Sequence, residues 1–156
     1  MKIGVLSDTH GLLREEVISA LNGCNAILHG GDINCQDILD ELNKIAPVIV
    51  VRGNNDKKWA EHIPYEATGE IEGIRFFMTH QKKNFPEDIS AYDLVVWGHT
   101  HRFCEKKIGN TIVLNPGCCG PRRPDQEITL AIVEKGETGS ITVRKIVIPN
   151  RDKRMK

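Results

Sequence analysis

Residues 2–10 read Lys2-Ile-Gly-Val-Leu-Ser-Asp-Thr-His10, and this stretch determines the fold that we expect. Its first half contains the short apolar run Ile3 to Leu6, which is typical of a buried strand. A carboxylate, Asp8, and an imidazole, His10, follow directly. Because the two stand two residues apart, an extended segment would send both side chains to the same face. The stretch therefore predicts a strand whose carboxyl end binds a metal or transfers a proton.

Length and charge point to one globular domain. The chain has 156 residues, with 21 basic and 21 acidic side chains, so its formal net charge is +0. That length suits a single domain spanning residues 1–156 with a sizeable core. We expect residues 151–156 to form a solvated, flexible end. The balanced charge gives no electrostatic reason to expect a nucleic-acid polymer or an anionic membrane as a partner.

The sequence also bears on the compartment. The chain begins directly with a strand pattern rather than a signal-peptide pattern, and no apolar run approaches the roughly 20 residues of a membrane span. The five cysteines include no Cys-x-x-Cys pair, which favours reduced thiols. We therefore expect a soluble, cytoplasmic protein, and homo-oligomerisation stays open.

Predicted strands and helices alternate in the first half of the chain. Apolar residues at helical spacing predict helices over 12–22 and 36–45, and short apolar runs predict strands over 26–29 and 48–51. The second half reads as successive strands at 66–72, 74–79, 93–97, 112–114, 128–133 and 141–148. This order predicts an α/β fold of two packed, mixed sheets with helices outside.

Five of the predicted strands run directly into side chains of a metal-binding type. These are Asp8 and His10, Asp32, Asn54, His80, and His99 with His101. Each has an ordinary explanation alone, such as a turn, a helix cap or a polar strand end. However, the carboxyl ends of strands gather at one edge of an α/β sheet, and four of the six histidines lie at these strand ends. The set therefore predicts one shared site.

The types of side chain indicate the chemistry of that site. A mixture of carboxylate, amide and imidazole groups suits divalent transition ions better than one structural zinc. Two such ions about 3.5–4 Å apart form the usual clamp for phosphoryl displacement. A site for phosphoryl transfer is therefore expected.

The order of the motifs resembles that of the calcineurin-like metallophosphoesterase superfamily. The motifs are Asp8-x-His10, Gly30-Gly31-Asp32, Gly53-Asn54-x-Asp56, a lone strand-end His80, and Gly98-His99-Thr100-His101. The short chain and Asn115-Pro-Gly followed by Pro-Arg are similar to its small single-domain branch, the YfcE-like phosphodiesterases. The resemblance implies a four-layer α/β/β/α sandwich of two mixed sheets flanked by helices. It also implies one metal held by Asp8, His10, Asp32 and His101, and a second held by Asp32, Asn54, His80 and His99.

The resemblance further implies a mechanism in which a hydroxide between the two metals attacks phosphorus. The carboxylate of Asp32 would bridge the ions, Asn54 would supply a neutral oxygen, and Asp56 would orient its neighbours. Asn55 would face the substrate, and Arg122 or Arg123 would stabilise the phosphate, unless these arginines serve only the surface loop. Manganese is the expected metal, with nickel, iron, cobalt or zinc as alternatives.

Three positions depart from the family pattern. Asn55 stands where many of these phosphatases have a histidine that protonates the leaving group, which favours diesters or good leaving groups over alkyl monoesters. Gln81-Lys82-Lys83 follows His80 where a Gly-His pair is usual. Cys118 replaces a serine after Asn115-Pro-Gly, either as a soft ligand or as a plain loop residue near the site.

These features predict a metal-dependent phosphodiesterase that acts on a small phosphodiester. The alternatives are a phosphomonoesterase or nucleotidase, and a non-catalytic scaffold like the retromer's small subunit, which shares this fold with an altered metal site. All seven expected ligands are present, which argues against the scaffold. A nuclease is disfavoured because no basic groove is evident.

Overall fold

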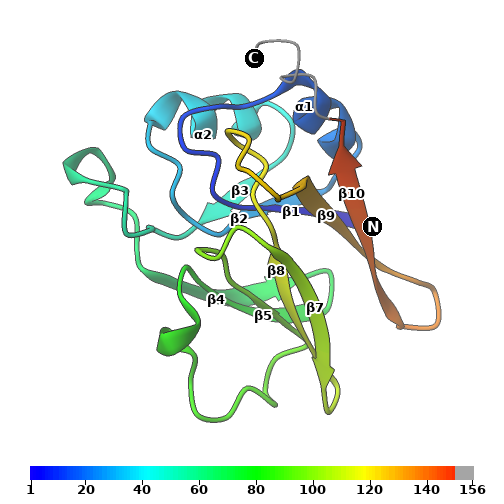
Figure 1. Ribbon diagram of the computed structural model, residues 1–156. Coiled ribbons are helices and arrows are strands. Elements are labelled where there is room, and N and C mark those ends of the chain that lie inside the picture. Colours follow the sequence, from blue (N-terminus) through cyan, green and yellow to red (C-terminus); the bar gives the residue numbers. More distant parts are fainter. Residues whose placement is uncertain (150–156) are drawn as a thin grey trace.

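The computed structural model describes residues 1–149 and contains two five-stranded sheets (Figure 1). The predicted end at 151–156 lies outside the described residues. The first sheet has the order β10-β9-β1-β2-β3, and the second has the order β4-β5-β6-β8-β7. The strands of the first sheet are β1 (Lys2–Leu6), β2 (Ala26–His29), β3 (Val48–Val50), β9 (Ile128–Lys135) and β10 (Ile141–Ile148). Those of the second are β4 (Glu66–Ile71), β5 (Ile74–Thr79), β6 (Leu94–Val96), β7 (Phe103–Ile108) and β8 (Thr111–Pro116).

Both sheets are mixed, as the sequence predicts. In the first sheet β1, β2 and β3 pair in parallel, whereas β9 runs antiparallel between β1 and β10. In the second sheet β5, β6 and β8 are parallel, and the outer strands β4 and β7 are antiparallel to their neighbours. The parallel strands of each sheet therefore end on the same side, which brings the loops that follow them together.

Three apolar clusters hold the layers together. The first sheet packs on the helices α1 (Glu15–Leu21) and α2 (Gln36–Asn43), which lie together on its outer face in Figure 1. The period-two alternation of β1 sends Leu6 toward the helices and Ile3 and Val5 into the cluster between the sheets. Likewise, β5 divides its apolar side chains between the inner and outer faces of the second sheet. Both faces of β1 and of β5 are thus buried, which is why both strands are apolar on both faces.

The predicted α/β class is confirmed, with one refinement in the outermost layer. The outer face of the second sheet, formed by Phe77, Val95 and Val113, is covered by side chains that include Phe85 and Trp97. This cover comes mainly from the loop after β5, which carries the short 3-10 helix η2 (Lys82–Asn84). A second 3-10 helix, η1 (Lys58–Ala60), follows β3. The described residues contain no α-helix on this side.

Strand β7 is absent from the elements that the sequence predicts. It forms an edge of the second sheet, and Glu105, Lys106 and Lys107 in its centre are exposed. Charged side chains protect sheet edges from pairing with other chains, and here they also hide the alternating apolar pattern that identifies strands.

The helices are short, and the cysteines are unpaired. Within residues 1–149, neither α-helix has the length and apolar character needed to cross a membrane. All five cysteines are free thiols, as the sequence predicts.

Candidate metal centre

The loops that follow β1, β2, β3, β5 and β6 converge on one cluster of side chains. Its ligand atoms form two groups, and the atoms of each group lie within 4.8 Å of one another. One group consists of Asp8, His10, Asp32 and His101, and the other of Asp32, His80 and His99. Oδ1 of Asn54 lies 3.2 Å from Nδ1 of His99. The structure thus brings together all seven side chains that the sequence singles out, and Asp32 belongs to both groups.

Asp8 has one oxygen held by the protein and one directed into the cluster. Its Oδ2 accepts hydrogen bonds from the hydroxyl of Ser7 at 2.7 Å and from the backbone N–H of His99 at 3.1 Å. Its Oδ1 is buried without a hydrogen-bond partner among the described residues and lies 3.3 Å from Nε2 of His101. Burial alone would raise the pKa of Asp8, but the imidazoles of His10 and His101 hold it well below its usual value. A carboxylate so placed remains ionised and fits a cation.

His80 also directs an unpartnered atom into the cluster. Its Nδ1 lies 2.7 Å from the backbone carbonyl of Gly30, so this nitrogen carries the proton and donates it. The buried Nε2 has no hydrogen-bond partner among the described residues and lies 3.1 Å from Oδ2 of Asp32. Metal-binding histidines typically donate their second ring N–H to a backbone carbonyl or a carboxylate. Nε2 of His80 and Oδ1 of Asp8, the two unpartnered atoms, fit divalent transition ions, for which this mixture of ligands is suited.

The backbone of the cluster is left-handed at most of its residues. The φ angles are 56° at Asp8, 45° at His10, 59° at Asp32, 71° at His99 and 65° at His101. Residues other than glycine rarely adopt such φ angles, and strained residues of this kind concentrate at functional sites. The prediction that an extended segment directs Asp8 and His10 to one face is therefore wrong. The backbone N–H groups of Asp8 and His10 donate hydrogen bonds to the carbonyls of Gly31 and Asp32, both at 2.9 Å. These bonds tie the loop after β1 to the loop after β2, and the two side chains converge there.

Asp56 holds the loop that carries Asp32. Its buried carboxylate accepts four backbone hydrogen bonds of 2.8–2.9 Å, and the donors are the N–H groups of Asp32, Ile33, Asn34 and Gly53. Asn55 reinforces this arrangement, because its backbone N–H and its side-chain amide donate to the two oxygens of Asp32, at 2.8 and 3.1 Å. Asp56 and Asn55 thus fix the main chain and the side chain of Asp32, respectively.

Two glycines allow the loops to approach one another. A Cβ atom at Gly53 would lie 2.1 Å from Oδ1 of Asp32, and one at Gly98 would lie 2.2 Å from Oγ of Ser7. Neither contact is sterically possible, so the glycine of Gly53-Asn54 and that of Gly98-His99 are required by close packing around the two aspartates.

Sequence reasoning missed Ser7 and Asn115 as supporting residues. The buried side chain of Asn115 donates to the carbonyl of Gly98 and to the hydroxyl of Thr100, both at 3.0 Å, and accepts from the N–H of Gly117 at 2.9 Å. It therefore fixes the loop that carries His99 and His101. The sequence identifies Asn115-Pro-Gly only as a feature of the family, and nothing in its composition predicts these hydrogen bonds.

His29 lies beside the cluster but is not one of its ligands. The N–H of Gly31 donates to its Nδ1 at 3.1 Å, so Nε2 carries the proton and donates it to the hydroxyl of Thr9 at 3.1 Å. Complete burial lowers the pKa of His29 to about 4, which keeps the ring neutral near pH 7. Its two nitrogens brace the loops after β1 and β2.

The arginines and the cysteine after β8 differ in burial and in their contacts with the site. Arg122 and Arg123 are exposed, and Arg123 interacts with the thiol of Cys118. That thiol is buried and donates to the backbone carbonyl of Asp8 at 3.1 Å. Burial raises the pKa of the Cys118 thiol, and its sulfur belongs to neither group of ligand atoms. The plain-loop interpretation of Cys118 is the one that this geometry favours.

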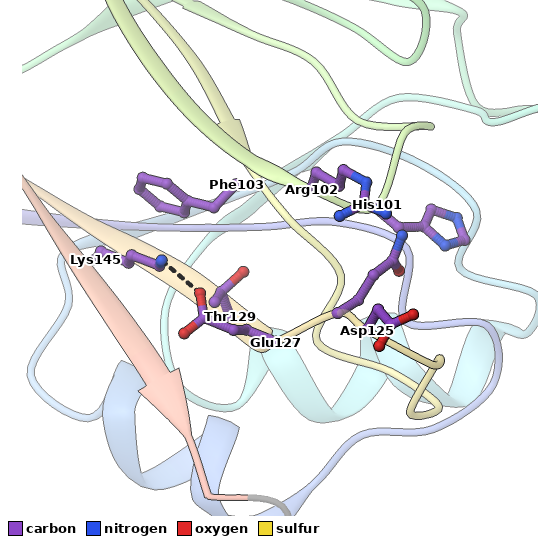
Figure 2. A pocket seen from close by; sticks show the side chains of 8 residues that line it. His101, Arg102, Phe103, Asp125, Glu127, Thr129 and Lys145 are labelled. Atoms are coloured by element: carbon purple, nitrogen blue, oxygen red, sulfur yellow. Dashed lines mark hydrogen bonds and ion pairs between the residues drawn. The ribbon is translucent and has the colours of Figure 1, made fainter.

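Two cavities adjoin the cluster through different ligands. One has a volume of about 280 Å³ and includes His80 and Asn54 in its lining. The other has a volume of about 220 Å³ and reaches the cluster at His101. Figure 2 shows this second cavity, in which Lys145 forms an ion pair with Glu127. A ligand at the cluster therefore has room to extend in two directions.

Comparisons with known proteins identify the family of the chain. The family model described as "Calcineurin-like phosphoesterase superfamily domain" matches residues 1–138. The chain is 31% identical over 165 residues to a phosphodiesterase of Methanocaldococcus jannaschii, covering 92% of this chain and 99% of the relative. It is 31% identical over 144 residues to the phosphodiesterase YfcE of Escherichia coli K12, covering 75% and 78%. The crystal structure of Vps29 from Chaetomium thermophilum shares the fold, with a TM-score of 0.74 at 17% identity over 95% of each chain. The family resemblance of the motifs is thus confirmed: the chain belongs to the calcineurin-like phosphoesterase superfamily.

Proposed function

We propose that the chain is a phosphodiesterase that uses two divalent metal ions, one at each group of ligand atoms. The observation that carries this proposal is the position of Asp32, which lies in both groups, beside the unpartnered atoms of Asp8 and His80. When bound, two such ions acidify water to give a nucleophile near neutral pH and neutralise the charge of the phosphate. Asp8, His10, Asp32 and His101 would hold one ion, and Asp32, Asn54, His80 and His99 the other.

The remaining residues of the site position these ligands and the substrate. Asp56 and Asn55 hold Asp32 in place, which limits reorganisation during the reaction. The amide of Asn55 donates to Asp32 and has no proton to give to a leaving group at pH 7. Arg122 or Arg123 would add positive charge near the phosphate; Arg123 interacts with Cys118, whose thiol donates to the backbone carbonyl of Asp8.

A diester fits the surroundings of the site better than a monoester. A diester has two substituents on phosphorus, and cavities adjoin the cluster at both His80 and His101. The absence of an acid at Asn55 favours leaving groups that need no protonation. We propose a small phosphodiester as the substrate and manganese as the metal, with nickel, iron, cobalt or zinc as alternatives. A cytoplasmic location, a single domain and homo-oligomerisation remain predictions.

The proposed function is tested by metal removal and replacement. The purified protein, incubated with Mn²⁺, should hydrolyse bis(4-nitrophenyl) phosphate, and EDTA should abolish the release of nitrophenolate. Adding back excess Mn²⁺ should restore the rate, because EDTA removes the ions but leaves the ligands Asp8, Asp32 and the histidines in place. The same assay with Ni²⁺, Co²⁺, Fe²⁺ and Zn²⁺ ranks the metals. Lack of activity with all five would contradict an enzymatic role and support the scaffold alternative.

Replacing Asn55 by histidine tests the origin of the preference for diesters. An Asn55→His variant should raise the ratio of monoester to diester turnover by roughly tenfold or more, because a positioned general acid contributes about 10²–10⁴. The ratio is measured with an alkyl monophosphate and bis(4-nitrophenyl) phosphate at several pH values. Asn55→Gln, which keeps an amide but supplies no acid, is the matched control. An equal ratio in the histidine and glutamine variants would mean that cavity shape sets the preference.

A further inference from the structure

The cavity beside His80 differs from the cavity beside His101 in the charge of the side chains that line it. Besides His80 and Asn54, its lining includes Arg52, Tyr65 and Lys83. None of the described residues that line it is acidic. The cavity beside His101, by contrast, contains Asp125 and Glu127 (Figure 2). An anionic ligand is therefore favoured on the His80 side.

Tyr65 presents an aromatic ring that is exposed and yet held in place. Its side chain is 58% exposed, a large value for an aromatic residue. The hydroxyl of Thr79 donates to the backbone carbonyl of Tyr65 at 3.3 Å, and the guanidinium carbon of Arg52 lies 5.2 Å from the ring centroid. Arg52 is itself fixed, because its guanidinium donates to the carbonyls of Asp56 and Lys57 at 3.0 and 3.2 Å. Arg52 therefore restrains the ring of Tyr65, which remains exposed for stacking.

Another part of the lining comes from a segment that the proposed chemistry leaves unused. Gln81, Lys83 and Asn84 line the cavity and follow directly after the ligand His80. Gln81 and Lys83 belong to the three residues that replace the usual Gly-His of the family. The amides of Gln81 and Asn84 both donate and accept hydrogen bonds, and Lys83 adds positive charge. A cavity lined by an aromatic ring, amides and a cation is suited to a flat, polar, heteroaromatic group.

We propose that this cavity binds a nucleoside arm of the phosphodiester, with the base stacked on Tyr65 and its edge facing Gln81 and Asn84. This inference rests on the proposed phosphodiesterase activity and names the class of its substrate. The phosphate would reach the metal ligands past His80 and Asn54, which line both the cavity and the cluster. The second substituent would extend toward His101.

Two diesters with the same leaving group test the inference. Thymidine 5′-(4-nitrophenyl) phosphate carries a nucleoside arm, and methyl 4-nitrophenyl phosphate does not. With Mn²⁺ present, wild type should show a kcat/KM for the thymidine ester that is higher by roughly 5- to 100-fold, which is the range expected for stacking one base on an aromatic ring. In Tyr65→Ala the ratio of the two kcat/KM values should fall close to one, mainly through KM.

Two controls separate stacking from other causes. Tyr65→Phe keeps the ring and should keep the ratio, and Val147→Ala removes another exposed apolar side chain, on β10, and should also keep it. Equal rates for both esters in wild type, or a preference that survives in Tyr65→Ala, would overturn the inference while the diesterase activity stands. If neither ester is hydrolysed, the proposed function fails. Calorimetric binding of thymidine 5′-phosphate, weakened in Tyr65→Ala but not in Tyr65→Phe, then tests the cavity independently of turnover; equal binding to both variants would overturn it.

Discussion

An Asp32→Asn variant is expected to lose both metal ions and at least roughly a thousandfold in kcat/KM for a diester. The reason is that Asp32 alone belongs to both groups of ligand atoms. Loss of a residue that only supports a ligand costs about 10- to 100-fold, and a carboxylate shared by two ions should cost more. The amide retains an oxygen that can accept hydrogen bonds from Asn55, so the loop should keep its shape. Elemental analysis of the dialysed protein gives the number of ions per chain.

Variants of ligands that belong to one group provide the comparison for Asp32→Asn. His10→Asn removes a ligand of the first group only, and His99→Asn removes one of the second only. Each should retain close to one ion per chain, whereas Asp32→Asn should retain close to none. Far-UV circular dichroism in EDTA verifies that all three variants are folded. Retention of nearly two ions by Asp32→Asn, or equal losses in all three variants, would contradict two sites that share this carboxylate.

The positions of the ligands were predictable because they depend on a simple pattern. Buried strands are recognisable from apolar runs such as Leu94 to Val96, and parallel strands place their carboxyl ends together. A polar residue directly after such a strand, like Asn54 or His80, is therefore brought to the site whatever the details of its loop. The prediction that Asp32 and His101 come together needed only this topology, although many residues separate them in the chain.

The conformation of the loops was not predictable, because long-range contacts determine it. Nothing local to Asp8 or His10 specifies a left-handed backbone; the bonds to Gly31 and Asp32 impose it. The cavity beside His80 is a similar case. Tyr65 precedes β4 and gives no signal in the sequence, yet the pairing of β4 with β5 places it beside Thr79 and hence near His80. The sequence identifies the side chains that form the cluster but not those that line the cavities beside it.

An Asp56→Ala variant is expected to lose at least about 3 kcal/mol of unfolding free energy. Asp56 is 3% exposed and accepts hydrogen bonds from four backbone N–H groups around Asp32. Each buried donor left without a partner costs about 1–3 kcal/mol, and water entering the space would recover part of this. The loss is large against the total of roughly 5–15 kcal/mol for a typical domain. Urea unfolding in EDTA measures it without any contribution from bound metal.

Asp88 offers a matched control, because it too accepts a backbone N–H, from Ser90 at 2.9 Å, but is exposed. Water replaces that bond when the carboxylate is removed, so Asp88→Ala should cost less than about 1 kcal/mol. Asp56→Asn keeps one accepting oxygen and should fall between the two alanine variants. If Asp56→Ala were no less stable than Asp88→Ala, the four bonds would not hold the loop.

Because these bonds also fix the left-handed Asp32, Asp56→Ala should weaken Mn²⁺ binding by about 10- to 100-fold, although its carboxylate belongs to neither group of ligand atoms.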